Sequence, residues 1–220
     1  ILYINLERSK DRNQNIINIS KDINTSLTRI NAFDGSNENI KEYVKNIKHE
    51  HLSNYEIACT LSHINAINTI SNLEGEYFLI IEDDISFDSV YSFRESLKDI
   101  IFNSPEFDIL MLNTSNKYNI NNLRYNNWND YSTKPSSAVA YIITKNAAIN
   151  FTKNNYIKNN KLKIKNKKLT VSDDFIYKNL KTIVYQFNYI TTTNKFVSTI
   201  HPYHLIHHLR YNYWNDITLK

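Results

Sequence analysis

The chain is poor in glycine, proline and cysteine. Its 220 residues contain two glycines, three prolines and one cysteine, where average usage would give about fifteen glycines. A phosphate-binding P-loop and a dinucleotide-binding fingerprint both need several glycines within a few residues. Gly35 and Gly75 cannot form either motif. The shortage also excludes a collagenous chain and a Gly/Ser-rich linker.

The single cysteine and the short apolar runs exclude further classes. One cysteine excludes an internal disulfide, and we expect no zinc site built on cysteines. No run of eighteen apolar residues occurs, so the sequence predicts no transmembrane helix, and it shows no signal-peptide pattern. The chain opens at Ile1 inside an apolar run without an initiator methionine, which is typical of an excised domain.

What the chain has in plenty indicates one folded domain. Hydrophobic residues make up 41% of it, with sixteen tyrosines and ten phenylalanines. Disordered chains are poor in aromatic residues, and a chain of this length can bury a sizeable core. Asparagine and isoleucine are unusually frequent, as AT-rich coding would produce, so we interpret many of the asparagines as solvated surface.

The net charge of +4 is concentrated in one segment. Residues 153–168 hold seven lysines and no acid, and the rest of the chain has a net charge of −3. This patch is local and contains a single aromatic residue, Tyr156, so we expect no nucleic-acid partner. One interpretation is a solvated, mobile loop, and the other is contact with a membrane surface or an anionic acceptor.

The hydrophobic pattern alternates between strands and helices. Continuous apolar strands separated by helices indicate an α/β domain with a mixed, mainly parallel sheet flanked by helices. We expect a polar loop over 113–135. The predicted strands are 1–6, 27–32, 77–81, 107–112, 138–144 and 182–187, and the predicted helices are 10–24, 37–48, 54–72, 89–103, 145–154 and 172–181.

Three adjacent carboxylates, Glu82, Asp83 and Asp84, follow the apolar strand 77–81 directly. Neighbouring carboxylates repel one another and are costly at a strand end unless they are solvated or paired with cations. Hard divalent cations prefer such oxygens and often carry substrate phosphates. Alternation along a strand turns Glu82 and Asp84 to one side and Asp83 to the other. The alternative is an acidic N-terminus for a helix over 85–103.

The helix predicted over 54–72 carries a second group of reactive side chains. Glu56 and His63 lie two turns apart and share a face, with Cys59 and Ser62 close to it. Such a face is commonly a solvated stripe, and Cys59 fits a small buried filler because no neighbouring residue marks a base for it. Ser53 precedes the helix as a candidate N-cap.

Four motifs occur in order along residues 1–84. They are Ile4-Asn-Leu-Glu-Arg-Ser-Lys-Asp-Arg12, Arg29-Ile-Asn-Ala-Phe-Asp-Gly35, Tyr55-Glu-Ile-Ala-Cys-Thr-Leu-Ser-His63 and Leu79-Ile-Ile-Glu-Asp-Asp84. Together they resemble glycosyltransferase family 25, the lipooligosaccharide and collagen β-galactosyltransferase group. A weaker likeness covers the strand over 138–144 with the four residues after it, and Ser172-Asp-Asp174 lies where the family often has a late acidic residue.

The resemblance implies a GT-A-like nucleotide-sugar-binding domain. It further implies a metal-dependent, inverting transferase that moves a hexose, galactose in the first instance, from a UDP-sugar to a hydroxyl of a glycan or of a hydroxylysine-type protein acceptor. The cofactor would be Mn²⁺ or Mg²⁺. Within a single domain over 1–220, residues 1–112 would bind donor and metal, and residues 113–220 would form the acceptor half and the C-terminal tail.

Site residues are assigned by position in these motifs. Asp173 or Asp174 is the candidate general base, although both acids could simply cap the helix over 174–181. The metal ligands would be Asp84 and Glu82, with His201 or His204 completing the shell unless 201–209 is an ordinary amphipathic helix. Arg8 and Arg12 suit phosphate, unless they pair with Glu7 or Asp11. The expected donor-binding residues are Asn5, Leu6, Arg8, Arg12, Ala32, Asp34, His63 and Asp83.

The sequence departs from the family pattern mainly at glycine. Tyr55 and Ala58 stand where the family has the two glycines of its helix start, and serines at 136 and 137 replace a glycine before the strand over 138–144. These replacements bear on the shape of the donor pocket. They motivate the alternative of a catalytically silent module that binds a nucleotide or a carbohydrate on the same fold.

Overall fold

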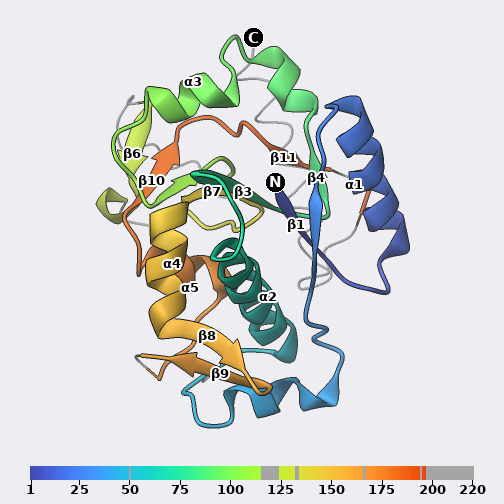
Figure 1. Cartoon of the computed structure of the whole chain (residues 1–220), viewed down its shortest axis with the longest axis vertical. Coiled ribbons are helices and arrows are strands. Elements are labelled where there is room, and N and C mark those ends of the chain that lie inside the picture. Colours follow the sequence, from blue (N-terminus) through green and yellow to red (C-terminus); the bar gives the residue numbers. More distant parts are fainter. Residues whose placement is uncertain (50, 115–123, 132–133, 166, 194, 197–220) are drawn as a thin grey trace.

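A computed structural model describes residues 1–49, 51–114, 124–131, 134–165, 167–193 and 195–196. Its central element is a seven-stranded sheet (Figure 1). Five strands run in one direction, and β7 and β6 run in the other. The strand order is β2 (Thr28–Asn31), β1 (Leu2–Asn5), β3 (Tyr77–Glu82), β7 (Ala140–Thr144), β5 (Ile109–Met111), β10 (Thr182–Tyr185) and β6 (Tyr125–Asn127). This confirms the predicted α/β class with a mixed, mainly parallel sheet.

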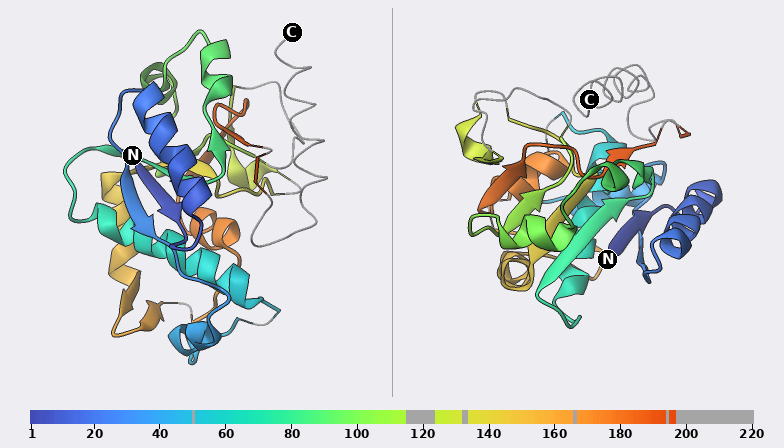
Figure 2. Two further views of the ribbon diagram at one scale, coloured as in Figure 1. Left: turned by 90° about the vertical axis from the view of Figure 1, so that its right-hand side faces the viewer. Right: turned by 90° about the horizontal axis from the view of Figure 1, so that it is seen from above.

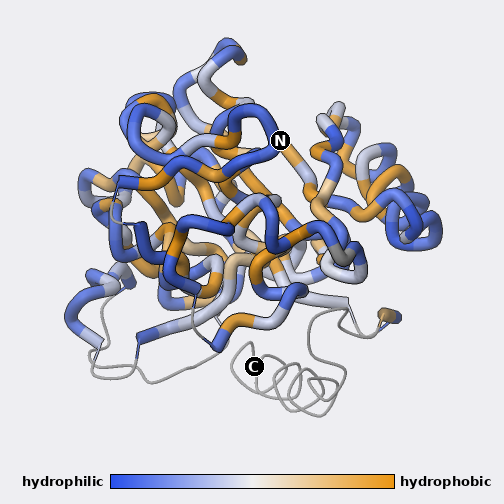
Figure 3. The backbone as a smooth tube through the Cα atoms, turned by 90° about the horizontal axis from the view of Figure 1, so that it is seen from below, coloured by the Kyte–Doolittle hydropathy of each residue, from blue (hydrophilic) through white to orange (hydrophobic). Residues whose placement is uncertain are grey.

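Helices cover both faces of the sheet because its strands are apolar on both sides. Alternate residues of β3 enter different cores: Phe78 and Ile80 face one, and Leu79 and Ile81 face the other. Figure 3 shows the hydrophobic segments gathered in the interior. One core packs against α2 (Asn54–Ile70), α4 (Lys145–Asn154) and α5 (Ser172–Tyr177), and the other against α1 (Lys10–Asp22) and α3 (Leu97–Phe102). Figure 2 shows α1 at one margin of the molecule.

The longest helix, α2, begins where the sequence predicts it. Ser53 accepts a hydrogen bond from the backbone N–H of Glu56, and the Glu56 carboxylate accepts one from the backbone N–H of Ser53. This reciprocal capping box satisfies two N–H groups that the first turn would otherwise leave without partners. Glu56 therefore caps the helix, while His63, two turns further on, is fully buried.

Two sequence predictions about local structure are wrong. No single helix covers 89–103: a 3-10 helix over Asp88–Ser92 ends in extended backbone, and Ser96 starts α3 with its own capping box to Asp99. The predicted loop over 113–135 contains β6 and a 3-10 helix over Trp128–Asp130. The helix predicted over 37–48 is present but shorter, as a 3-10 helix over Glu38–Val44.

The lysine-rich segment is not a loop but a hairpin of β8 (Asn155–Lys158) and β9 (Lys161–Ile164), drawn at the bottom of Figure 1. Asn159 and Asn160 adopt positive φ angles of 51° and 54° at its turn, as a two-residue hairpin turn requires. Ile157, Leu162 and Ile164 pack against the core. The other side of the hairpin exposes Tyr156, Lys158, Lys161 and Lys163.

A second two-stranded ribbon pairs β4 (Ile85–Ser86) with β11 (Thr191–Thr192). It follows the acidic trio directly, so no helix begins at residue 85 and the helix-capping interpretation of Glu82–Asp84 is wrong. The backbone N–H of Thr193 donates to the carbonyl of Asp84 at 2.7 Å. The turn that carries the acids is thereby held between two strands.

Candidate functional site

The ends of several strands meet at one edge of the sheet and form a pocket. β1, β2 and β3 end there, and β7, which runs the other way, begins there. Ligands of such sheets bind at this kind of edge. The pocket is open to solvent and, with the solvent space at its mouth, spans about 630 Å³. Its lining includes seven residues expected at the site: Leu6, Arg12, Ala32, His63, Glu82, Asp83 and Asp84.

A buried ion pair fixes the turn after β3. Arg12 on α1 places its Nη1 atom 2.8 Å from Asp83 Oδ1 and 3.4 Å from Asp84 Oδ2. Asn5 donates to Asp83 Oδ2 at 2.7 Å from behind. Both oxygens of Asp83 therefore have protein partners, so its carboxylate is less open to a ligand than its neighbours. Arg12 therefore pairs with these two acids. The alternative, in which it pairs with Glu7 or Asp11 at the surface, is wrong.

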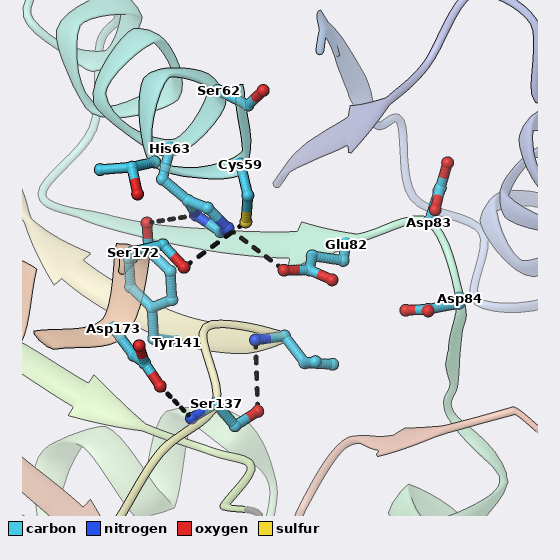
Figure 4. Close-up of polar contacts among 12 residues, drawn as sticks. Cys59, Ser62, His63, Glu82, Asp83, Asp84, Ser137, Tyr141, Ser172 and Asp173 are labelled. Atoms are coloured by element: carbon cyan, nitrogen blue, oxygen red, sulfur yellow. Dashed lines mark hydrogen bonds and ion pairs between the residues drawn. The ribbon is translucent and has the colours of Figure 1, made fainter. Parts of the chain in front are cut away.

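One of the two carboxylate oxygens of Asp84 is unpaired within the described part of the chain. This atom, Oδ1, is buried and has no hydrogen-bond partner among the described residues. The pKa of Asp84 is raised to about 7, mainly by burial and also by the charge of Glu82, with Arg12 acting against both. Figure 4 shows the carboxyl group of Asp84 directed to the side on which Glu82 lies, with Asp83 pointing away, as strand alternation predicts. A buried acceptor without a donor is the feature expected of a cation ligand.

Glu82 is held by a histidine that is itself oriented by a tyrosine. His63 Nε2 lies 3.2 Å from Glu82 Oε1, and His63 Nδ1 lies 3.1 Å from the hydroxyl of Tyr141 on β7. His63 and Tyr141 are both fully buried. His63 thus touches Glu82 and the pocket at once, and its ring orientation is fixed from the opposite side.

Cys59 lies next to this pair, one helical turn before His63. Its thiol donates to Ser172 Oγ at 3.4 Å, and burial, together with the charge of Glu82, raises the pKa of the thiol. Within the described ranges, Cys59, His63 and Glu82 form a group whose possible ligand atoms all lie within 4.8 Å of one another. This arrangement could hold a metal ion, but it does not by itself point to Mn²⁺ or Mg²⁺.

The two candidate bases lie in different surroundings. Asp173 accepts from the backbone N–H of Ser137 at 3.1 Å and from that of Asp174 at 3.0 Å, and burial raises its pKa. Figure 4 shows it on the same side of the sheet as Glu82 and His63. Asp174 instead lines a separate hollow beside Lys165 and Lys168.

The remaining expected residues lie at the edge of the pocket or outside the described chain. Arg8 pairs with Asp34, the residue between the pocket-lining residues Phe33 and Gly35. His201 and His204, the candidates for completing a metal shell, lie outside the described residues.

Two contacts were missed by sequence reasoning. Tyr141 is the one polar side chain inside the apolar run Ala140–Ile143, and that isolation is a signal of a buried hydroxyl needing a partner. Ser137 has a φ of 137°, an unusual value for a residue with a side chain. Its hydroxyl donates to Asn113 Oδ1 at 2.7 Å. The signal for Ser137 was the family glycine that it replaces.

Comparison with known proteins agrees with this geometry. A family model described as glycosyltransferase family 25 (LPS biosynthesis protein) matches residues 1–203. A search of curated proteins found no match. Among the residues that the structure describes, no helix is both long and apolar enough to cross a bilayer. The mixed sheet with helices on both faces is consistent with a GT-A-like fold. The chain belongs to glycosyltransferase family 25.

Proposed function

We propose that this glycosyltransferase moves a hexose, galactose in the first instance, from a UDP-sugar to a hydroxyl of a glycan or of a hydroxylysine-type protein side chain. The reaction would be metal-dependent and would invert the anomeric centre. The observation that carries the proposal is the pocket at the strand ends, where Asp84 presents a buried carboxylate oxygen without a partner.

Asp84 and Glu82 are the residues that would hold the cation. Both line the pocket, and the charge of Glu82 acts on Asp84. Oxygen ligands of this kind suit Mn²⁺ or Mg²⁺. When bound, the ion would supply positive charge for the diphosphate that leaves the sugar. With only two glycines in the chain, side chains must do what a glycine-rich loop does elsewhere.

Arg12 and Asn5 act behind the carboxylates. Because Arg12 contacts both Asp83 and Asp84, and Asn5 holds the other oxygen of Asp83, these residues orient the acidic turn. Leu6 and Ala32 offer apolar wall to the donor, and the paired Arg8 and Asp34 lie at the edge, where ribose or base groups could be bound.

Asp173 is the better candidate for the general base. It lies on the side of Glu82 and His63, whereas Asp174 lines a different hollow. Burial raises its pKa, which makes the carboxylate a stronger base toward an acceptor hydroxyl. The backbone N–H of Ser137 holds the carboxylate in place. In this scheme residues 1–112 supply the donor and metal side chains, and the later half supplies Ser137 and the base.

The hairpin β8–β9 is proposed to contact an anionic lipid surface at which an acceptor is presented. Lys158 and Lys161 are direct cross-strand partners, and Tyr156 lies opposite Lys163. Like charges placed opposite each other, as in the Lys158–Lys161 pair, destabilise a hairpin. An anionic surface offsets that repulsion by about 1 kcal/mol per lysine.

Vesicle sedimentation tests this contact. We expect binding to vesicles containing phosphatidylglycerol and not to pure phosphatidylcholine, with affinity at least about 100-fold lower when Lys158, Lys161 and Lys163 are replaced by glutamate. Lys21→Glu with Lys98→Glu, both exposed elsewhere, is the control. Equal binding of both vesicle types would disprove the contact.

Donor turnover tests the central proposal. Purified chain would be screened with UDP-sugars and Mn²⁺ or Mg²⁺, and free UDP measured with and without glycan acceptors. We expect metal-dependent UDP release from UDP-galactose, lost in Asp84→Asn and kept in Asp22→Asn, an exposed acid at the end of α1. Binding of donor without turnover of any sugar would support the silent module instead. Neither binding nor turnover would refute both.

A further inference from the structure

A sulfur, an imidazole nitrogen and a carboxylate oxygen converge at the inner end of the pocket. Cys59 and His63 lie four residues apart on α2 and therefore project from the same side of the helix. Glu82, the last residue of β3, meets them from the sheet, with its Oε1 atom 3.2 Å from His63 Nε2. Figure 4 shows the three side chains pointing toward one another.

The spacing of these atoms is close to that around a tetrahedral zinc ion. Metal–ligand bonds of about 2.0–2.3 Å place neighbouring ligand atoms about 3.3–3.6 Å apart. Here all three lie within 4.8 Å of one another, and the histidine–glutamate pair is already at 3.2 Å. A small movement of the Cys59 side chain would complete three sides of a tetrahedron.

The surroundings preorganise the group. The Tyr141 hydroxyl contacts His63 Nδ1 at 3.1 Å, so the other ring nitrogen is turned toward Glu82. Outer hydrogen bonds of this kind fix metal-binding histidines in other proteins. Ser172 Oγ lies 3.4 Å from the Cys59 sulfur. The capping box at Ser53 anchors the start of the helix that carries both Cys59 and His63.

The same three residues line the pocket, so an ion has a path to them and a fourth ligand could come from the pocket. This is the pattern of zinc sites with three protein ligands and one exchangeable ligand. Thiolate and imidazole favour Zn²⁺ over the hard cations that suit Asp84. The single cysteine had excluded a zinc site built on cysteines, but it does not exclude one of mixed ligands.

We propose that Cys59, His63 and Glu82 form a Zn²⁺ site, distinct in chemistry from the oxygen ligands around Asp84. Binding exchanges the thiol proton for the metal: the S–H bond breaks, a sulfur–zinc bond forms and one proton passes to the buffer. A second consequence rests on the proposed function. Because Glu82 would serve both ions, Zn²⁺ would inhibit the Mn²⁺-dependent transfer.

Cobalt is the spectroscopic probe, because a thiolate bound to Co²⁺ gives a charge-transfer absorption that oxygen ligands do not. The full chain, freed of metal with a chelator, would be titrated with Co²⁺ and then with Zn²⁺. We expect one equivalent of Co²⁺ to produce the thiolate band and one equivalent of Zn²⁺ to remove it. Circular dichroism would verify that each protein used is folded.

Three variants separate this site from the donor site. Cys59→Ser should lose the band. Tyr141→Phe should keep it with affinity about 10- to 100-fold lower, as loss of an outer hydrogen bond predicts. Asp84→Asn should retain the band and lose Mn²⁺-dependent UDP release.

The absorption readout needs neither donor nor turnover, so it can fail or succeed independently of the proposed function. Folded wild-type chain that gives no thiolate band would overturn the proposal. Equal Zn²⁺ affinity of the wild type and Cys59→Ser would overturn it as well.

Discussion

Replacing Asp84 with asparagine should stabilise the metal-free protein above neutral pH. Asp84 is buried beside Glu82, and its pKa rises from the ordinary 3.8 to about 7, with burial as the main cause. Well below pH 4 the folded and unfolded states both carry the proton, so the carboxyl adds no pH dependence. As the pH rises toward 7 the unfolded state loses its proton first, so the stability of the wild type falls.

The size of this effect follows from the two pKa values. A difference of about three pH units corresponds to about 4 kcal/mol, which we take as the upper limit of the effect. Asparagine keeps the shape of the protonated acid and carries no charge. At pH 8 the variant should therefore be more stable by about 1–4 kcal/mol, and at pH 4 the difference should fall below about 1 kcal/mol.

Urea unfolding in the presence of a chelator, at several pH values between 4 and 8, measures this difference. Asp22→Asn is the matched control and should show no comparable pH dependence, because Asp22 is exposed. Adding Mn²⁺ at pH 8 should stabilise the wild type and not Asp84→Asn. If the variant is the less stable protein at pH 8, the attraction between Asp84 and Arg12 outweighs burial and the reasoning fails.

Other substitutions test the supports of the site, each by urea unfolding. Gly35→Ala should destabilise the fold by about 1–3 kcal/mol or more, because an added Cβ would lie 2.6 Å from the Cα of Tyr55; unchanged stability would contradict this contact. Ser137→Ala keeps the positive φ and loses the hydrogen bond to Asn113, so it should lower the free energy of unfolding by about 1–3 kcal/mol. Ser137→Gly should be more stable than Ser137→Ala, because glycine adopts a positive φ without strain. Arg12→Met should cost about 3–5 kcal/mol by leaving two buried carboxylates without their cation, and a neutral result would show that the pair contributes little.

The sequence predicted the strands and the acidic turn because both depend on local pattern. The continuous apolar run before Glu82 requires a buried strand, and a strand that ends in acids must place them at the edge of the sheet. The motif order then gave most of the pocket lining. What it did not give was the partner of each carboxylate: the pairing of Arg12 with Asp83 joins residues 71 positions apart.

Three local errors have different physical origins. The strand β6 was predicted as loop because asparagine, at 126 and 127, has a low propensity for strands. Its pairing with β10 joins residues far apart in the sequence, which local pattern does not reveal. The start of a new helix at Ser96 could have been predicted, since Ser96 and Asp99 have the spacing of a capping box. The lysine hairpin was missed because composition outweighed its alternation of apolar and charged residues around the asparagine pair at 159–160.

The reversed strand β7 has a consequence for how the protein is made. It is the only strand in the described sheet that joins β3 to β5, so β1–β2–β3 and β5 share no hydrogen-bonded partner until residues 140–144 have been synthesised. Synthesis from residue 112 to residue 144 takes about two to six seconds. During that interval the apolar edge of β3 is open to other nascent chains. The yield of folded protein should therefore depend on how well this edge is shielded on the ribosome.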